Sequence, residues 1–340
     1  MKKMTLVLIF LLIAAMVSFA VDVNVGGEFV LGYTATKEAS HGAMPKIELN
    51  VDSTIDENTK VSMELDCEGD DFDSLNVSLD DFRLSSNILA ALGLESPVSL
   101  ELTVGYYDAF FKNWNYVSRA GVEHYYSQPN LTALCLACPS AGETSGDIKI
   151  GFGDFALHYW NDFDFENMLA GVSGTVADFN FFASYGAPFK AAGEGYFWID
   201  AGYSLNAGPV DLYLPAMFTY NTANEELDAY GWSSGIAADV DMVHASVGIG
   251  GVESSAIKNI IPEVSIAPVE GSDIFAIGYL DASADSVYQS IDVGASYKVG
   301  AMTLGLGGVI AADDTVYTAL WSDTFSMNGS GFYMVFDVDF

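Results

Sequence analysis

The last ten residues, 331–340, read GFYMVFDVDF and decide the fold. Their side chains form two alternating sets, one made of Phe332, Met334, Phe336, Val338 and Phe340 and the other of Tyr333, Val335, Asp337 and Asp339. Because successive side chains of a strand point to opposite faces, this pattern predicts a β-strand with one apolar and one mainly polar face. The strand stops on an aromatic residue.

The same period of two recurs throughout the rest of the chain. The alternating segments are 22–34, 45–54, 60–67, 74–82, 98–107, 119–127, 147–160, 168–176, 179–185, 196–205, 210–220, 229–240, 243–251, 259–267, 273–280, 287–299, 302–311 and 331–340. About ten residues is the length that a tilted strand needs to cross the hydrocarbon layer of a membrane. We therefore predict an all-β fold, a closed antiparallel transmembrane β-barrel of about 16–18 strands.

The charged residues of these segments fall on the polar phase. We expect seven carboxylates to line a pore: Glu48, Asp52, Glu64, Glu101, Asp211, Asp239 and Asp292. A charge that faces lipid at the bilayer midplane costs several kcal/mol, so a barrel confines such groups to its interior. A soluble β-sandwich would show the same alternation. Strand length, and short turns that alternate with longer loops, favour the barrel.

The N-terminus predicts an exported protein. Lys2 and Lys3 precede an apolar run, and Ser18 and Ala20 are small residues at the positions that a signal peptidase reads. We expect a signal peptide at 1–20, cleaved after Ala20, and a barrel at 21–340. The alternative, an anchor helix, needs about 20 apolar residues, more than this run supplies.

The charge balance excludes one class of partner. The chain has 46 Asp and Glu against 12 Lys and Arg, a net charge of −34. Nucleic-acid binding requires clustered Lys and Arg, so we expect no nucleic-acid partner.

The terminal strand, the signal peptide and the series of hairpins together resemble the bacterial outer-membrane β-barrel porins, in particular the general porins. The resemblance implies residence in the outer membrane, contact with its lipid, and a homotrimer. It also implies that Phe340 belongs to an assembly signal that the barrel-assembly machinery reads.

The alternating pattern is weakest in the region 108–146, which includes the expected strand 119–127. General porins carry at this position a loop that folds into the barrel and narrows it, so the resemblance makes 108–146 a candidate constriction. Its candidate residues are Phe110, Phe111, Trp114 and Arg119. The aromatic residues fit a pore lining and also fit the aromatic girdle at the membrane surface.

Other chemistry is weakly represented. Cys135 and Cys138 have the spacing of a redox or metal pair, but a zinc site needs two further ligands. A loop disulfide and unpaired thiols both remain open. The acidic clusters do not follow the calcium-loop pattern, so we read them as solvated loops. We expect no cofactor, no metal and no enzymatic activity.

The function that this sequence predicts is passive diffusion of small hydrophilic solutes through an acidic, cation-preferring pore. Two alternatives stand beside it. One is a structural or adhesive barrel of the outer envelope. The other is a substrate-specific channel for sugars or peptides, in which Tyr106, Phe110, Phe111 and Trp114 form a stacking path.

Overall fold

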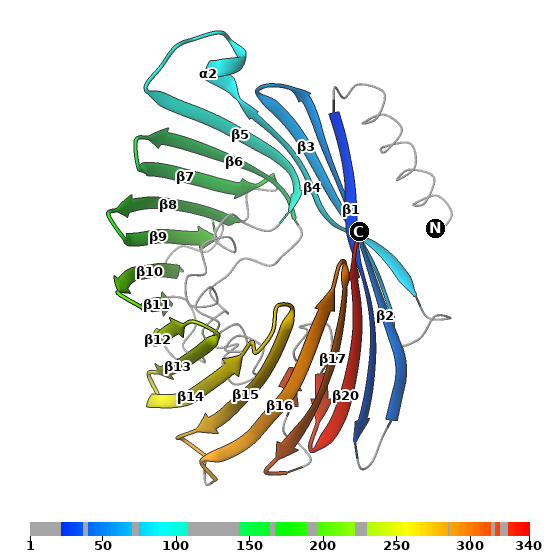
Figure 1. The fold of residues 1–340 in the computed structure, drawn as a ribbon. Coiled ribbons are helices and arrows are strands. Elements are labelled where there is room, and N and C mark those ends of the chain that lie inside the picture. The colour runs from blue at the N-terminus through cyan, green and yellow to red at the C-terminus, as the bar shows by residue number, and fades with distance from the viewer. Residues whose placement is uncertain are drawn as a thin grey trace.

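The computed structural model describes residues 22–36, 40–69, 75–107, 143–163, 167–188, 196–221, 230–284, 286–313, 317–319 and 326–340. Eighteen strands form one closed ring (Figure 1). In chain order they are β1 (Asp22–Thr36), β2 (Ser40–Asp56), β3 (Thr59–Glu68), β4 (Asn76–Asn87), β5 (Val98–Tyr107), β6 (Glu143–Phe152), β7 (Phe155–Asp162), β8 (Asn167–Val176), β9 (Phe179–Pro188), β10 (Tyr196–Ala207), β11 (Val210–Asn221), β12 (Tyr230–Val240), β13 (Val243–Val252), β14 (Ser255–Ile266), β15 (Ser272–Asp281), β16 (Tyr288–Val299), β17 (Met302–Ala311) and β20 (Gly331–Asp339).

The first and last strands close the ring. β1 pairs antiparallel with β2 on one side and with β20 on the other, where Glu28 lies opposite Asp339 and Thr36 opposite Gly331. Every strand of the ring therefore has two neighbours, and the ring itself has no open edge. The predicted all-β antiparallel barrel is confirmed, with 18 strands.

One predicted strand is wrong in detail. The segment 147–160 contains parts of two strands, β6 and β7, which are joined by a tight turn at Gly153 and Asp154. Gly153 has a φ of +58°, a backbone conformation that glycine adopts without strain. The alternating apolar positions shift from even to odd residue numbers across this turn. This shift indicates two strands, whereas the prediction treats 147–160 as one strand.

Another predicted strand, 119–127, lies outside the described residues. β5 pairs directly with β6, from Val98 opposite Phe152 to Tyr107 opposite Glu143. The ring therefore has no place for a further strand between these two.

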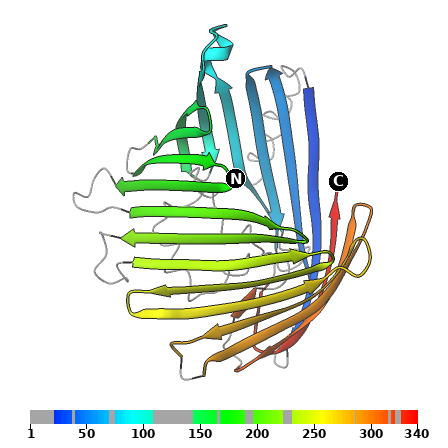
Figure 2. The same cartoon turned by 60° about the vertical axis from the view of Figure 1, so that its left-hand side comes forward.

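The connections are sorted by length between the two ends of the barrel. At one end, here called the turn end, the links 57–58, 153–154, 177–178, 208–209, 241–242 and 300–301 are two residues long. The exceptions are 267–271 and the link 88–97, which contains the short helix α2 (Ile88–Ala91). At the other end, the loop end, most links are longer, and 312–330 includes the hairpin of β18 (Tyr317–Ala319) and β19 (Ser326–Asn328). Figure 2 shows the strands from the side.

The two faces of the wall differ in exposure. On β17 the outward Leu304 and Leu306 are 53% and 52% exposed, whereas Val309 on the opposite phase is 3% exposed. Side chains on the concave face of a ring crowd one another, and those on the convex face splay apart. The apolar phase therefore faces outward, toward lipid in a transmembrane barrel. Within the described residues, no helix is long and apolar enough to cross a membrane.

One outward patch departs from this rule. On β2 and β3 the outward Val51, Val61, Met63 and Leu65 form a hydrophobic cluster and are only 2–7% exposed. Leu79 and Phe82 of β4 pack against them. The outer surface is therefore not uniform around the ring.

Candidate pore lining

The seven carboxylates expected to line the pore all lie on the inward phase of their strands. Glu48 and Asp52 come from β2, Glu64 from β3, Glu101 from β5, Asp211 from β11, Asp239 from β12 and Asp292 from β16. Residues at directly opposite positions of neighbouring strands point to the same face, and Asp211 lies opposite Asp239. Six of the seven are exposed or partly exposed, but Asp292 is fully buried.

Four carboxylates form a row across the closure of the barrel, and we call it the acidic row. Asp339 of β20 lies opposite Glu28 of β1, Glu28 opposite Glu48 of β2, and Glu48 opposite Asp66 of β3. Like charges at directly opposite positions repel one another and destabilise a sheet. This arrangement therefore requires water, bound cations or neighbouring basic groups to offset the repulsion.

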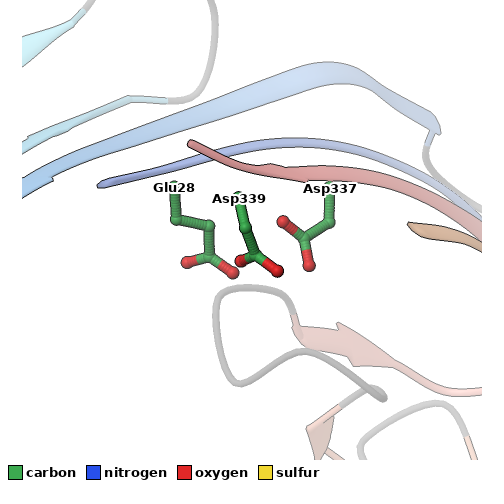
Figure 3. Close-up of side chains that lie close together, drawn as sticks. All are labelled: Glu28, Asp337 and Asp339. Carbon is green, nitrogen blue, oxygen red and sulfur yellow. The ribbon is translucent and has the colours of Figure 1, made fainter. Parts of the chain in front are cut away.

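The side chains of the acidic row and of its neighbours converge. Figure 3 shows Glu28, Asp337 and Asp339 projecting from the same face of β1 and β20. One carboxylate oxygen from each of these three lies within 4.8 Å of the others, and the same holds for the group Glu48, Glu64 and Asp66.

Two lysines flank the row. Lys298 Nζ lies 2.8 Å from Asp339 Oδ2, and Lys46 Nζ lies 3.4 Å from Glu48 Oε2. Asn50 also donates a hydrogen bond of 2.7 Å to Glu48. The carboxylates of the two groups still outnumber these lysines, so this part of the inner wall has a negative net charge.

The acidic surface continues onto β4. Arg83 Nε donates to both carboxylate oxygens of Asp81, at 2.9 and 2.8 Å. Asp81 lies opposite Glu64, next to a register shift between Glu64 and Leu65. That bulge changes which side chains of β4 face inward. The predicted strand 74–82 ends before Arg83, so the sequence did not identify the pair of Asp81 and Arg83.

The opposite part of the wall, from β7 to β15, is more apolar. Its inward side chains include Trp160, Phe182, Met217, Ile277 and Tyr279, each at most 3% exposed. Small and polar residues lie between them, and His158 Nε2 shares a hydrogen bond of 2.9 Å with Ser173 Oγ. Carboxylates also lie on these strands, among them Asp200, Asp211 and Asp239, so this part of the inner surface combines buried apolar side chains with acidic ones. Sequence reasoning assigned these apolar residues no role.

Two of the seven carboxylates, Asp239 and Asp211, lie at the turn end and have polar partners. His244 Nδ1 lies 2.7 Å from Asp239 Oδ1, and Asn206 donates 2.6 Å to Asp211 Oδ1. Both carboxylates are exposed.

The terminal residue Phe340 is 61% exposed. It exchanges two backbone hydrogen bonds of 2.9 Å with Gly27 of β1, which extends the closing strand pair to the end of the chain. The candidate constriction residues Phe110, Phe111, Trp114 and Arg119 and the cysteines Cys135 and Cys138 lie outside the described residues. Within the described residues, Cys67 is a free thiol.

Among the comparisons with known proteins, the one with solved structures identifies the fold. No family model and no curated protein matches the chain. Among solved structures, a mutant of Rh. blastica porin matches with a TM-score of 0.56 and 14% identity, over 94% of this chain and all of that one. A triple mutant of Rhodopseudomonas blastica porin matches with a TM-score of 0.54 and 13% identity over the same shares. A structure titled "Asymmetric conductivity of engineered proteins" matches with a TM-score of 0.55 and 13% identity, again over 94% of this chain and all of that one. The chain therefore has the fold of these porins.

Proposed function

We propose that this chain, which has the fold of a bacterial porin, is a passive diffusion channel of the outer membrane that admits small hydrophilic solutes and prefers cations. The observation that supports the proposal most directly is the acidic row on the inner face of a closed 18-stranded ring. Barrels of this size enclose an aqueous channel. Carboxylates that line such a channel raise the local concentration of cations and repel anions.

The acidic row favours a channel over an adhesive or structural barrel. An adhesive role would place its recognition residues on exposed loops and would not require like charges at opposite positions inside the barrel. Those charges repel one another, as described above, and a solute path through the ring gives them a function.

The proposal also includes features of the N-terminus, the 108–146 region, the chain end and the assembly of the barrel. The signal peptide 1–20 is removed after Ala20, and the segment around Phe110, Phe111, Trp114 and Arg119 narrows the pore. Cys135 and Cys138 form a disulfide in the oxidising cell envelope. The assembly machinery recognises Phe340, and the mature barrels associate as trimers. Mass spectrometry of the mature, non-reduced protein tests the cleavage and the disulfide, and cross-linking tests the trimer.

Liposome swelling tests the channel itself. Purified mature protein is reconstituted into vesicles, and the vesicles are diluted into isotonic solutions of sugars of increasing size. A passive channel predicts rapid swelling with small sugars and a decline with solute size, without saturation. Vesicles that swell no faster than protein-free vesicles would contradict the proposal. Saturation by one sugar would favour the substrate-specific alternative.

A further inference from the structure

The inner wall has a concavity of about 600 Å³ at the turn end, between β2 and β5. Polar and charged groups dominate its lining, which includes Asp52, Glu57, Lys60, Arg83, Asn87 and Glu101. A cavity of this size lies within the range of small-molecule sites. The acidic row lies on the same wall, closer to the closure of the barrel.

The strand register fixes the order of charges across this cavity. Asp52 of β2 lies opposite Ser62 of β3, Lys60 of β3 lies opposite Ser85 of β4, and Asn87 of β4 lies opposite Glu101 of β5. The β5 residue on the same row as Asp52 is Gly105, and Glu101 lies four residues further along β5. With strands about 4.8 Å apart and a rise of about 3.3 Å per residue, the backbones of Asp52 and Glu101 are roughly 19 Å apart. Lys60 lies on a strand between them. The cavity thus places one ammonium group between two carboxylates.

Most of these charges have no protein partner. Arg83 is bound by Asp81 through two hydrogen bonds. Among the described residues, Lys60, Asp52, Glu57 and Glu101 make no ion pair. The groups left available to a ligand are therefore one cation and three carboxylates, together with the hydroxyl group of Ser62. The Ser85 hydroxyl shares a hydrogen bond of 2.9 Å with Thr103.

We infer that this cavity is a binding site for a basic amino acid, that is, a solute with one carboxylate and two cationic groups. The solute's carboxylate pairs with Lys60, and its α-ammonium and side-chain cation pair with Glu57 and Glu101. These two carboxylates are nearer to each other than Asp52 and Glu101 are, because Asn87, which lies opposite Glu101, donates its backbone N–H to Asn58. Charge-assisted hydrogen bonds of this kind are the strong ones. The inference rests on the proposed channel, since it assigns that channel a preferred solute.

The test is block of the potassium current through single channels by L-arginine. Agmatine, which is arginine without its carboxylate, and glycine, which has no side-chain cation, serve as probes of the two halves of the site. In the wild type, L-arginine should produce transient blocks at lower concentration than either probe. Equal block by all three compounds would overturn the inference while leaving the channel itself established. Absence of any current would instead contradict the proposed function.

Variants locate the site within the pore. Lys60→Gln removes the partner of the carboxylate and should raise the half-blocking concentration of L-arginine about tenfold, with little change for agmatine. Glu101→Gln should weaken block by both compounds. Lys258→Gln, on β14 and outside the cavity, serves as the control for Lys60→Gln and should change neither. If Lys60→Gln and Lys258→Gln gave the same result, the assignment to this cavity would be wrong.

Discussion

Tyr333 of β20 donates a hydrogen bond of 3.0 Å to Asp292 of β16, and the bond passes across the intervening strand β17. Gly307 lies opposite Tyr333 and makes room for its ring: a Cβ atom at this position would lie 2.1 Å from Tyr333 Cζ. Both partners are buried, Asp292 at 0% and Tyr333 at 1% exposed. The tyrosine thus lies flat on the inner wall and links three strands next to the closure of the barrel.

The first prediction concerns this glycine. Gly307→Ala places a methyl group inside the contact distance of the tyrosine ring and forces the ring or the strand to move. We expect a loss of about 1–3 kcal/mol in the free energy of unfolding, as for other overpacked sites. Gly308→Ala is the matched control, because its Cβ would point outward with the nearest atom at an ordinary 3.4 Å. Urea unfolding followed by gel mobility measures both, and equal midpoints would contradict the account.

The second prediction tests which face of the wall meets lipid. Leu304→Lys should impair assembly more than Thr303→Lys, since a lysine on the lipid side costs up to about 2–4 kcal/mol, the value reached at the midplane, and less toward the ends of a strand. Leu304 is 53% exposed on the outer face, whereas Thr303 lies opposite Asp337 and Lys298 on the inner face. Leu212→Lys against Asp211→Lys repeats the comparison on β11. The measurement is the yield of heat-modifiable protein in membranes. Equal yields for lysine on the outer and inner phases would contradict the assignment of the outer face to lipid.

The third prediction concerns the chain end. Phe340→Ser keeps the backbone bonds to Gly27 possible but removes the exposed ring, so a folding defect and a recognition defect can be separated. We expect a reduced membrane yield in cells and near-normal refolding of the purified chain in detergent. Unchanged yield in cells would argue against Phe340 as an assembly signal.

The fourth prediction concerns the acidic row. Glu28→Gln removes one charge from between Asp339 and Glu48 and should stabilise the barrel at low salt by relieving repulsion. The gain should shrink at 1 M salt, where the Debye length falls to about 3 Å. Asn24→Gln, on the same strand but opposite Asp52, is a control without a charge change. A stabilisation that is independent of salt would contradict an electrostatic cause.

The fold could be predicted from the sequence because the barrel repeats one rule. Each strand alternates lipid-facing and inward residues, and local sequence contains that alternation. The segment 98–107 was located to the residue as β5. The errors arose where the rule changes phase within a few residues, at the turn of Gly153 and Asp154 and at the bulge of β4.

The site could be predicted only in part. The inward phase of Glu48 or Glu101 follows from alternation within one strand. The acidic row depends on the register between neighbouring strands, and the sequence of a single strand does not predict that register. The hydrogen bond from Tyr333 to Asp292 joins residues 41 positions apart in the sequence, so it could be identified only in the folded barrel. Alternation predicts that Asp292 faces the lumen. It does not predict that the side chain of Tyr333 packs over Asp292 and buries it.

The reversal potential of the channel under a potassium chloride gradient tests the central claim most directly. The account predicts a cation preference that weakens as salt rises, because the Debye length falls from about 10 Å at 0.1 M to about 3 Å at 1 M. Exchanging Glu28, Glu48 and Glu64 for Gln should shift the reversal potential toward zero. An anion preference of the wild-type channel, or a reversal potential that these exchanges leave unchanged, would contradict it.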